Sequence, residues 1–230
     1  MRLTSMNRIA LAAALLFVLS ACVPSHAQYS APPNTGATFK DTSMLKPPTG
    51  AKIAIFKFED LECPACSHAY PIVHAAAERY KIPIVRHDFP LKMHIWSRDA
   101  AITARYLQDK VSPQIAEEFR GAVFAAQMSI ASKEDLNHFT QKFFQNHKLN
   151  MPFVMDPSGL FAAEVNADYT LGERIGITQT PTIWVVSQKN WVQVTDINQL
   201  YATIDTMLAQ VGSSTTASTA KPHHTTTQKQ

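Results

Sequence analysis

The chain has 230 residues, of which 46% are hydrophobic and 17% charged, an ordinary globular composition with room for a substantial core. The net charge of +3 comes from the two ends, because Arg2, Arg8, Lys221 and Lys229 lie in segments without acids. Without these four, 17 basic and 18 acidic residues remain. The body of the chain is therefore nearly neutral and lacks the basic footprint of a nucleic-acid-binding protein.

The first 21 residues have the pattern of an export signal. Residues 1–8 carry two arginines and no acid, and residues 9–21 (IALAAALLFVLSA) form an apolar run of 13. This run is short for a membrane-spanning helix, which needs about 20 residues. A signal peptide over residues 1–21 is therefore favoured over a short membrane-anchor helix.

Two processing sites compete at the end of this signal. The stretch LSAC, which ends at Cys22, resembles the bacterial lipobox, in which the cysteine is lipidated and becomes the new N-terminus. The stretch SHA at residues 25–27 fits ordinary signal peptidase instead. We favour the lipobox because it adjoins the apolar run and accounts for the unpaired cysteine. In both cases the mature protein is periplasmic or otherwise extracytoplasmic, where disulfides persist, and acyl chains on Cys22 would anchor it to a membrane.

Polar segments flank the central part of the chain. Residues 22–50 contain several prolines and are predicted to be a semi-extended tether, and residues 212–230 are rich in Ser, Thr and Gln and are predicted to be a disordered tail. Local patterns between them predict a strand over 51–59, a helix over 63–80, a strand over 82–89, helices from 95 to 148, a helix from 156 to 175, a hairpin of strands over 182–187 and 191–195, and a closing helix over 197–211.

The stretch CPAC places Cys63 and Cys66 at the start of the first predicted helix. Two intervening residues at a helix start let the sulfurs meet, and the free N–H groups and positive dipole end there favour a thiolate at Cys63. Cys66 lies one turn further in, where it can attack a mixed disulfide formed at Cys63. The pattern favours a redox-active pair.

A zinc site, a c-type haem site and a permanent disulfide fit the cysteine pair less well. A zinc site commonly needs a second pair of ligands, and the chain has no second cysteine pair. A c-type haem needs a histidine directly after the second cysteine, where Ser67 stands. A permanent structural disulfide is the third alternative, since disulfides persist outside the cytoplasm. No metal site is predicted.

A second motif, TQTPT at residues 178–182, lies far along the chain from the cysteines. The strand, CPAC, the helix and then TQTPT before another strand resemble the thioredoxin fold, in which a cis-proline turn lies against the cysteine pair. Thr180 and Pro181 match that turn, which would pair with a substrate strand. A trans proline at a strand start is the alternative.

The long helical region between the two motifs resembles the DsbA-like oxidoreductases, including the BdbD type. The resemblance implies an α/β, thioredoxin-like fold, with a central mixed sheet flanked by helices. It implies a thioredoxin-like domain formed by residues 51–94 and 150–211, and a helical insertion over residues 95–149.

The sequence departs from this family's pattern around the cysteines. Ala65 stands where DsbA has a histidine, and the acids Glu59, Asp60 and Glu62 disfavour a thiolate, so a weaker oxidant than DsbA is expected. Lys57 occupies the position six residues before Cys63, where the family usually has a buried acid. Lys57 either extends its ammonium to water or is buried, where it could tune the Cys63 thiolate or accept the Cys66 proton.

These features predict an exported thiol–disulfide oxidoreductase that acts as an oxidase, with Cys63 as nucleophile and Cys66 as resolving thiol. No external cofactor is needed, since the redox-active Cys63–Cys66 disulfide carries the electrons. The expected partners are extracytoplasmic proteins with cysteines and a membrane protein that resets the pair, and no nucleic acid. The alternatives are a reductase of the same fold, for example in cytochrome maturation, and a metal-handling or chaperone module without turnover.

Overall fold

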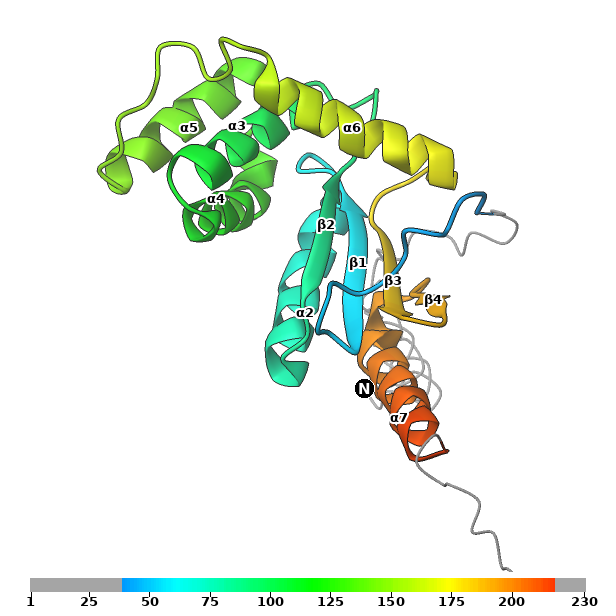
Figure 1. Ribbon diagram of the computed structural model, residues 1–230. Coiled ribbons are helices and arrows are strands. Elements are labelled where there is room, and N and C mark those ends of the chain that lie inside the picture. The colour runs from blue at the N-terminus through cyan, green and yellow to red at the C-terminus, as the bar shows by residue number, and fades with distance from the viewer. Residues whose placement is uncertain (1–38, 218–230) are drawn as a thin grey trace, which may run out of the picture.

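A mixed four-stranded sheet forms the centre of the computed structural model, which describes residues 39–217 (Figure 1). The strand order is β2-β1-β3-β4, and the bounds are Ile53–Glu59 for β1, Ile84–Asp88 for β2, Thr182–Ser187 for β3 and Trp191–Gln193 for β4. β1 pairs in parallel with β2 and antiparallel with β3, and β3 and β4 form the predicted antiparallel hairpin. The α/β, thioredoxin-like fold class predicted from the sequence is confirmed.

Helices cover both faces of the central strand β1, and every one of its residues is therefore buried. On one face, Ile53 and Ile55 pack against α2 (Pro64–Tyr80) and α7 (Leu200–Ala217). On the other face, Phe56 and Phe58 pack in a cluster that receives the end of α6 (Leu160–Ile175). The strand predicted over residues 51–59 is thus an inner strand of the sheet, covered on both faces.

The region between β2 and α6 is helical, as the sequence predicts. It contains α3 (Ser97–Lys110), α4 (Pro113–Ala126), the short 3-10 helix η1 (Gln127–Ser129) and α5 (Lys133–Asn146). Ser112 and Ser132 cap α4 and α5, and each side chain accepts a hydrogen bond from the backbone N–H three residues later. The apolar core of these helices also contains Leu61 and both cysteines, so it reaches the dithiol.

α6 connects this helical region to the sheet, and Figure 1 shows it running across the end of the strands. It begins at Leu160, four residues after the predicted start at Asp156. Gly159 has φ of 72°, a left-handed conformation that no helix interior accepts, and Asp156 instead accepts a hydrogen bond from the Ala162 N–H. Gly176 ends the helix with φ of 96°, as predicted.

Both flanking segments contain more structure than the sequence suggests. Residues 39–50, predicted as part of the tether, pack on the domain: Leu45 is buried, and the Phe39 ring lies 5.1 Å from that of Trp184. Helix α7 continues to Ala217, so residues 212–217 are helical rather than part of a disordered tail. The predicted signal peptide, Cys22 and the rest of the tail lie outside the described residues. Within residues 39–217, each helix is too short or too polar to cross a bilayer.

Candidate active site at the start of α2

The two cysteines occupy the first turn of α2, where the strand β1 delivers the chain into the helix. Cys63 is the N-cap residue and Cys66 lies one turn inside, and both are free thiols. Pro64 occupies the first helical position, where its missing N–H is not needed. Cys63 is 6% exposed and Cys66 is 2% exposed, so the pair is shielded unequally.

The TQTPT segment lies beside this pair although 117 residues separate Cys63 from Thr180. The Cys63 Sγ donates a hydrogen bond to the Thr180 carbonyl oxygen at 3.2 Å, and the Thr180–Pro181 peptide bond is cis, as the sequence predicts. The Thr180 side chain is itself buried, and Thr182, two residues further along the chain, begins β3. The structure therefore brings together the four residues that the two motifs single out.

The two thiols differ in their ionisation. A hydrogen bond from the Cys66 thiol lowers the pKa of Cys63 to about 6, helped by the Thr180 side chain and the Cys66 backbone N–H and opposed by burial. Burial raises the pKa of the Cys66 thiol well above its ordinary value, and the hydrogen bond to Cys63 adds to this effect. As the pH rises through about 6, Cys63 therefore loses the proton that it donates to the Thr180 carbonyl and becomes a thiolate, while Cys66 keeps its proton.

Lys57 lies on β1 and is fully buried, so the interpretation that its ammonium extends to water is wrong. Its Nζ lies 2.6 Å from Glu59 Oε2 and 5.3 Å from the centre of the Tyr70 ring. Burial lowers the pKa of Lys57, while the charge of Glu59 opposes that change. In the sequence Glu59 stands out only as a charge near Cys63, although strand alternation places residues 57 and 59 on the same face.

Glu59 is the centre of a buried charge cluster that joins the sheet to the helical region. Its Oε1 lies 2.5 Å from Arg86 Nε on β2 and 3.6 Å from Arg120 Nη1 on α4. Burial disfavours the Glu59 carboxylate, but the nearby cations outweigh it and lower its pKa. The cluster continues through ion pairs that involve Asp88, Arg105, Glu117 and Asp168. Sequence reasoning missed this cluster because its members come from separate elements.

Asp60 and Glu62 have structural partners that sequence reasoning also missed. The Asp60 N–H donates to Cys66 Sγ at 3.5 Å, and the Asp60 carboxylate binds the segment after β2. Glu62 Oε2 accepts hydrogen bonds from the Trp96 and Ser97 N–H groups at the start of α3. These two acids therefore hold the active-site turn against the segment after β2 and the start of α3.

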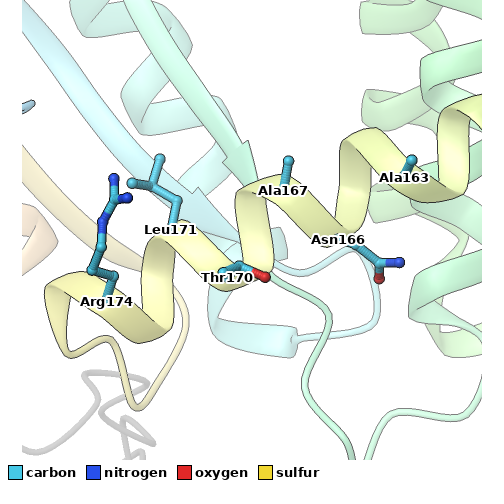
Figure 2. Close-up of a pocket in the computed structure, with 6 residues that line it drawn as sticks. All are labelled: Ala163, Asn166, Ala167, Thr170, Leu171 and Arg174. Carbon is cyan, nitrogen blue, oxygen red and sulfur yellow. The ribbon is translucent and has the colours of Figure 1, made fainter.

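Among residues 39–217, the surface also has hollows that lie away from the cysteines. One hollow of about 500 Å³ lies on α6 and is lined by side chains of that single helix, among them Asn166, Leu171 and Arg174 (Figure 2). It contains neither cysteine. Among residues 39–217 no group of three or more His, Cys, Asp and Glu side chains is placed to hold a metal ion.

The comparisons with known proteins agree with this geometry. The family model described as Thioredoxin matches residues 41–206. No curated protein sequence matches the chain.

Among solved structures, α-DsbA2 from Wolbachia pipientis, a thiol-disulfide exchange protein, is 17% identical, with a TM-score of 0.55 over 70% of this chain and 85% of that chain. A variant of α-DsbA1 from the same organism is 15% identical, with a TM-score of 0.59 over 76% of this chain and 100% of that chain. ScsC from Proteus mirabilis, in a transitional conformation, is 16% identical, with a TM-score of 0.55 over 89% of this chain and 90% of that chain.

At these identities the solved structures show the fold alone, while the family model covers most of the chain and all of the dithiol site. The chain therefore belongs to the thioredoxin family, with the fold of the DsbA-like thiol–disulfide oxidoreductases.

Proposed function

We propose that this protein exchanges disulfides with cysteine-containing proteins outside the cytoplasm, through Cys63 and Cys66, and that it acts as an oxidase. The observation that carries the proposal is geometric: two free thiols lie one helical turn apart at the start of α2, with the Cys63 Sγ 3.2 Å from the Thr180 carbonyl oxygen. The lowered pKa of Cys63 and the raised pKa of Cys66 support it. A thiolate is the reactive form of cysteine, and a protonated neighbour is held in reserve for the second step.

The exchange proceeds in two balanced steps in each direction. When the dithiol is reduced, the Cys63 thiolate attacks a disulfide of the partner, which forms a mixed disulfide and releases one partner thiolate. Cys66 then loses its proton and attacks the Cys63 sulfur, which releases the second partner thiolate and closes the Cys63–Cys66 disulfide. In the oxidase direction a partner dithiol runs these steps in reverse and leaves with a disulfide, while the protein keeps two thiols. The electrons travel in the cysteine pair, so the reaction needs no further cofactor.

The segment around Thr180 and Pro181 supplies the place where a partner chain would lie. It runs directly into β3 and its carbonyl lies beside Cys63, so an extended peptide that reaches the sulfur also meets this backbone. Main-chain hydrogen bonds along such a segment bind many sequences with little preference for side chains. This suits an enzyme that accepts cysteines in different proteins.

The ionisation of Cys63 gives a direct test. Because its pKa is lowered to about 6, the thiolate forms as the pH rises through about 6. We expect the alkylation rate of the reduced protein to rise about tenfold between about pH 5 and pH 7 and then to level off. An ordinary thiol, with a pKa of about 8.5, continues to gain reactivity over the next two units. A rate that still climbs steeply above about pH 8 would contradict the proposed nucleophile.

The same property bears on the direction of the reaction. Thioredoxin and DsbA have nucleophile pKa values of about 7 and about 3.5, and reduction potentials of about −270 and −120 mV. The pKa of Cys63, about 6, lies between these two pKa values, and we expect its reduction potential to lie between theirs. A potential measured in glutathione buffers separates the oxidase from the reductase alternative. A membrane redox partner that reoxidises the dithiol completes the oxidase proposal.

The proposed location rests on the sequence of the first 27 residues. We expect the mature protein to begin at Cys22 and to carry acyl chains, because LSAC follows the apolar run directly. Intact-mass analysis of the protein purified from membranes measures this. A soluble product that begins at Gln28 would show that the SHA site is used instead, and a product that retains Met1 would remove the export proposal.

A further inference from the structure

Asp60 occupies a central position in the active-site turn. Its side chain has no exposed surface, and both carboxylate oxygens accept hydrogen bonds. Oδ1 accepts from the Glu62 N–H at 2.7 Å, and Oδ2 accepts from the Leu91 N–H at 2.6 Å and from His94 Nδ1 at 2.7 Å. A buried carboxylate needs such donors, since it has lost its water.

The backbone of the same residue contacts both cysteines. The Asp60 N–H donates to Cys66 Sγ at 3.5 Å, and the Asp60 carbonyl accepts from the Cys63 N–H at 3.1 Å. The hydrogen bond from Cys66 lowers the pKa of Cys63 most strongly, and the negative charge of Asp60 acts against it. The backbone of Asp60 therefore helps to position the two cysteines, and its negative charge affects the pKa of Cys63.

His94 is the side chain that reaches this carboxylate from the segment between β2 and α3. Its imidazole is 17% exposed, and its neighbours Met93 and Ile95 are largely exposed, so it lies between the surface and the buried acid. The segment is held nearby by the Leu91 N–H and by Glu62, which accepts from the start of α3. A donor in this position both fixes the carboxylate and weakens its field at Cys63.

We propose that His94 is a positioning residue of the exchange reaction: its Nδ1–H holds Asp60, which fixes the turn at residues 60–62 against both cysteines and limits the repulsion between Asp60 and the Cys63 thiolate. This deepens the proposed function, on which it rests, and adds a residue that touches neither sulfur. The titratable groups that face Asp60 are Cys63 and Cys66 of α2, Glu62 of the same turn, and His94.

The test compares two substitutions of His94. His94→Ala removes the hydrogen-bond donor to Asp60. In His94→Asn, the side-chain amide N–H can donate to Asp60 in place of the Nδ1–H. We expect His94→Ala to raise the midpoint of the Cys63 thiolate titration by about one unit, and to slow alkylation at about pH 6 several-fold. His94→Asn should recover most of the wild-type titration. His147→Asn is the matched control, because His147 also pairs with a carboxylate, at 3.2 Å from Glu118 on α4.

A double-mutant cycle separates this role from a general loss of stability. Asp60→Asn removes the charge that His94 engages, so His94→Ala should change the Cys63 titration much less in that background. Three results would each overturn the proposal. His94→Ala could shift the Cys63 titration midpoint by the same amount with and without Asp60→Asn, it could leave the midpoint unchanged, or His94→Asn could fail to recover the wild-type midpoint. Alkylation needs no partner protein. A wild type that fails to exchange disulfides would therefore remove the proposed function, while the titrations still decide the role of His94.

Discussion

Replacing Cys63 by Ser is expected to abolish disulfide exchange, whereas Cys66→Ser should accumulate mixed disulfides between Cys63 and partner proteins. The reason is the asymmetry of the pair: Cys63 lies at the helix start with a pKa lowered to about 6, while burial raises the pKa of Cys66 well above its ordinary value. Without Cys63 no thiolate begins the reaction, and without Cys66 no second thiol releases the partner. Insulin reduction, a dithiol-oxidation assay and non-reducing gels measure the two outcomes.

Ser67→Ala is the matched control for this pair of substitutions. Ser67 follows Cys66 in the same helix, and its Oγ donates a hydrogen bond to the Phe124 carbonyl at 3.0 Å. Its loss changes the contact between α2 and α4 without touching either sulfur, and we expect exchange to persist. Mixed disulfides that form in Cys63→Ser but not in Cys66→Ser would reverse the assignment of nucleophile and resolving thiol.

The parts of the fold that the sequence predicted well have local causes. Residues 53–56 are apolar on both faces, as suits a strand that is covered on both sides, and CPAC follows β1 at a helix start with Pro64 in the first position. The cis Thr180–Pro181 bond was predicted through the family resemblance. The packing of Leu45 depends on contacts with distant segments, so no local pattern predicts it. The late start of α6 at Leu160 follows from the left-handed conformation of Gly159, which the helix predicted from Asp156 did not take into account.

At the site, too, the sequence identifies residues that belong to local motifs and misses contacts between distant segments. The sequence identified the cysteines and Pro181, and strand alternation placed Lys57 on the face that α2 covers. It did not identify the cations that pair with Glu59 or the histidine that contacts Asp60, because Arg86, Arg120 and His94 come from three other parts of the chain. From the sequence, Glu59, Asp60 and Glu62 are expected only to disfavour a thiolate at Cys63. In the structure Glu59 is paired with cations, and Asp60 and Glu62 accept hydrogen bonds.

Lys57→Met is expected to slow the second step of exchange more than the first. Burial raises the pKa of Cys66 most, and the charge of Glu59 adds to this effect. The Lys57 amine, 2.6 Å from Glu59, offsets that charge. Without the amine the pKa of Cys66 should rise further, and each added unit slows release of the mixed disulfide about tenfold. The Cys63 titration should move less, since Asp60 is the carboxylate whose charge acts on that thiol.

The substitution also removes one partner of a buried ion pair, which commonly costs about 3–5 kcal/mol of stability. Glu59 keeps Arg86 at 2.5 Å and Arg120 at 3.6 Å, so we expect a loss near the lower limit and a folded protein at room temperature. Arg105→Met is the control for this cost. Arg105 belongs to the same buried cluster but pairs with Asp88 and Asp168, so its loss should lower stability and leave the second step unchanged.

A double variant, Lys57→Met with Glu59→Gln, removes both charges of the pair and should restore the rate of the second step. Stopped-flow measurement of mixed-disulfide decay, with thiolate absorbance against pH for Cys63, resolves the two steps. A raised Cys63 titration midpoint with normal decay would mean that Lys57 acts directly on the outer thiolate. If both quantities match the wild type, Lys57 has only a packing role. Slow decay that the second substitution repairs would assign the Lys57–Glu59 pair to deprotonation of Cys66.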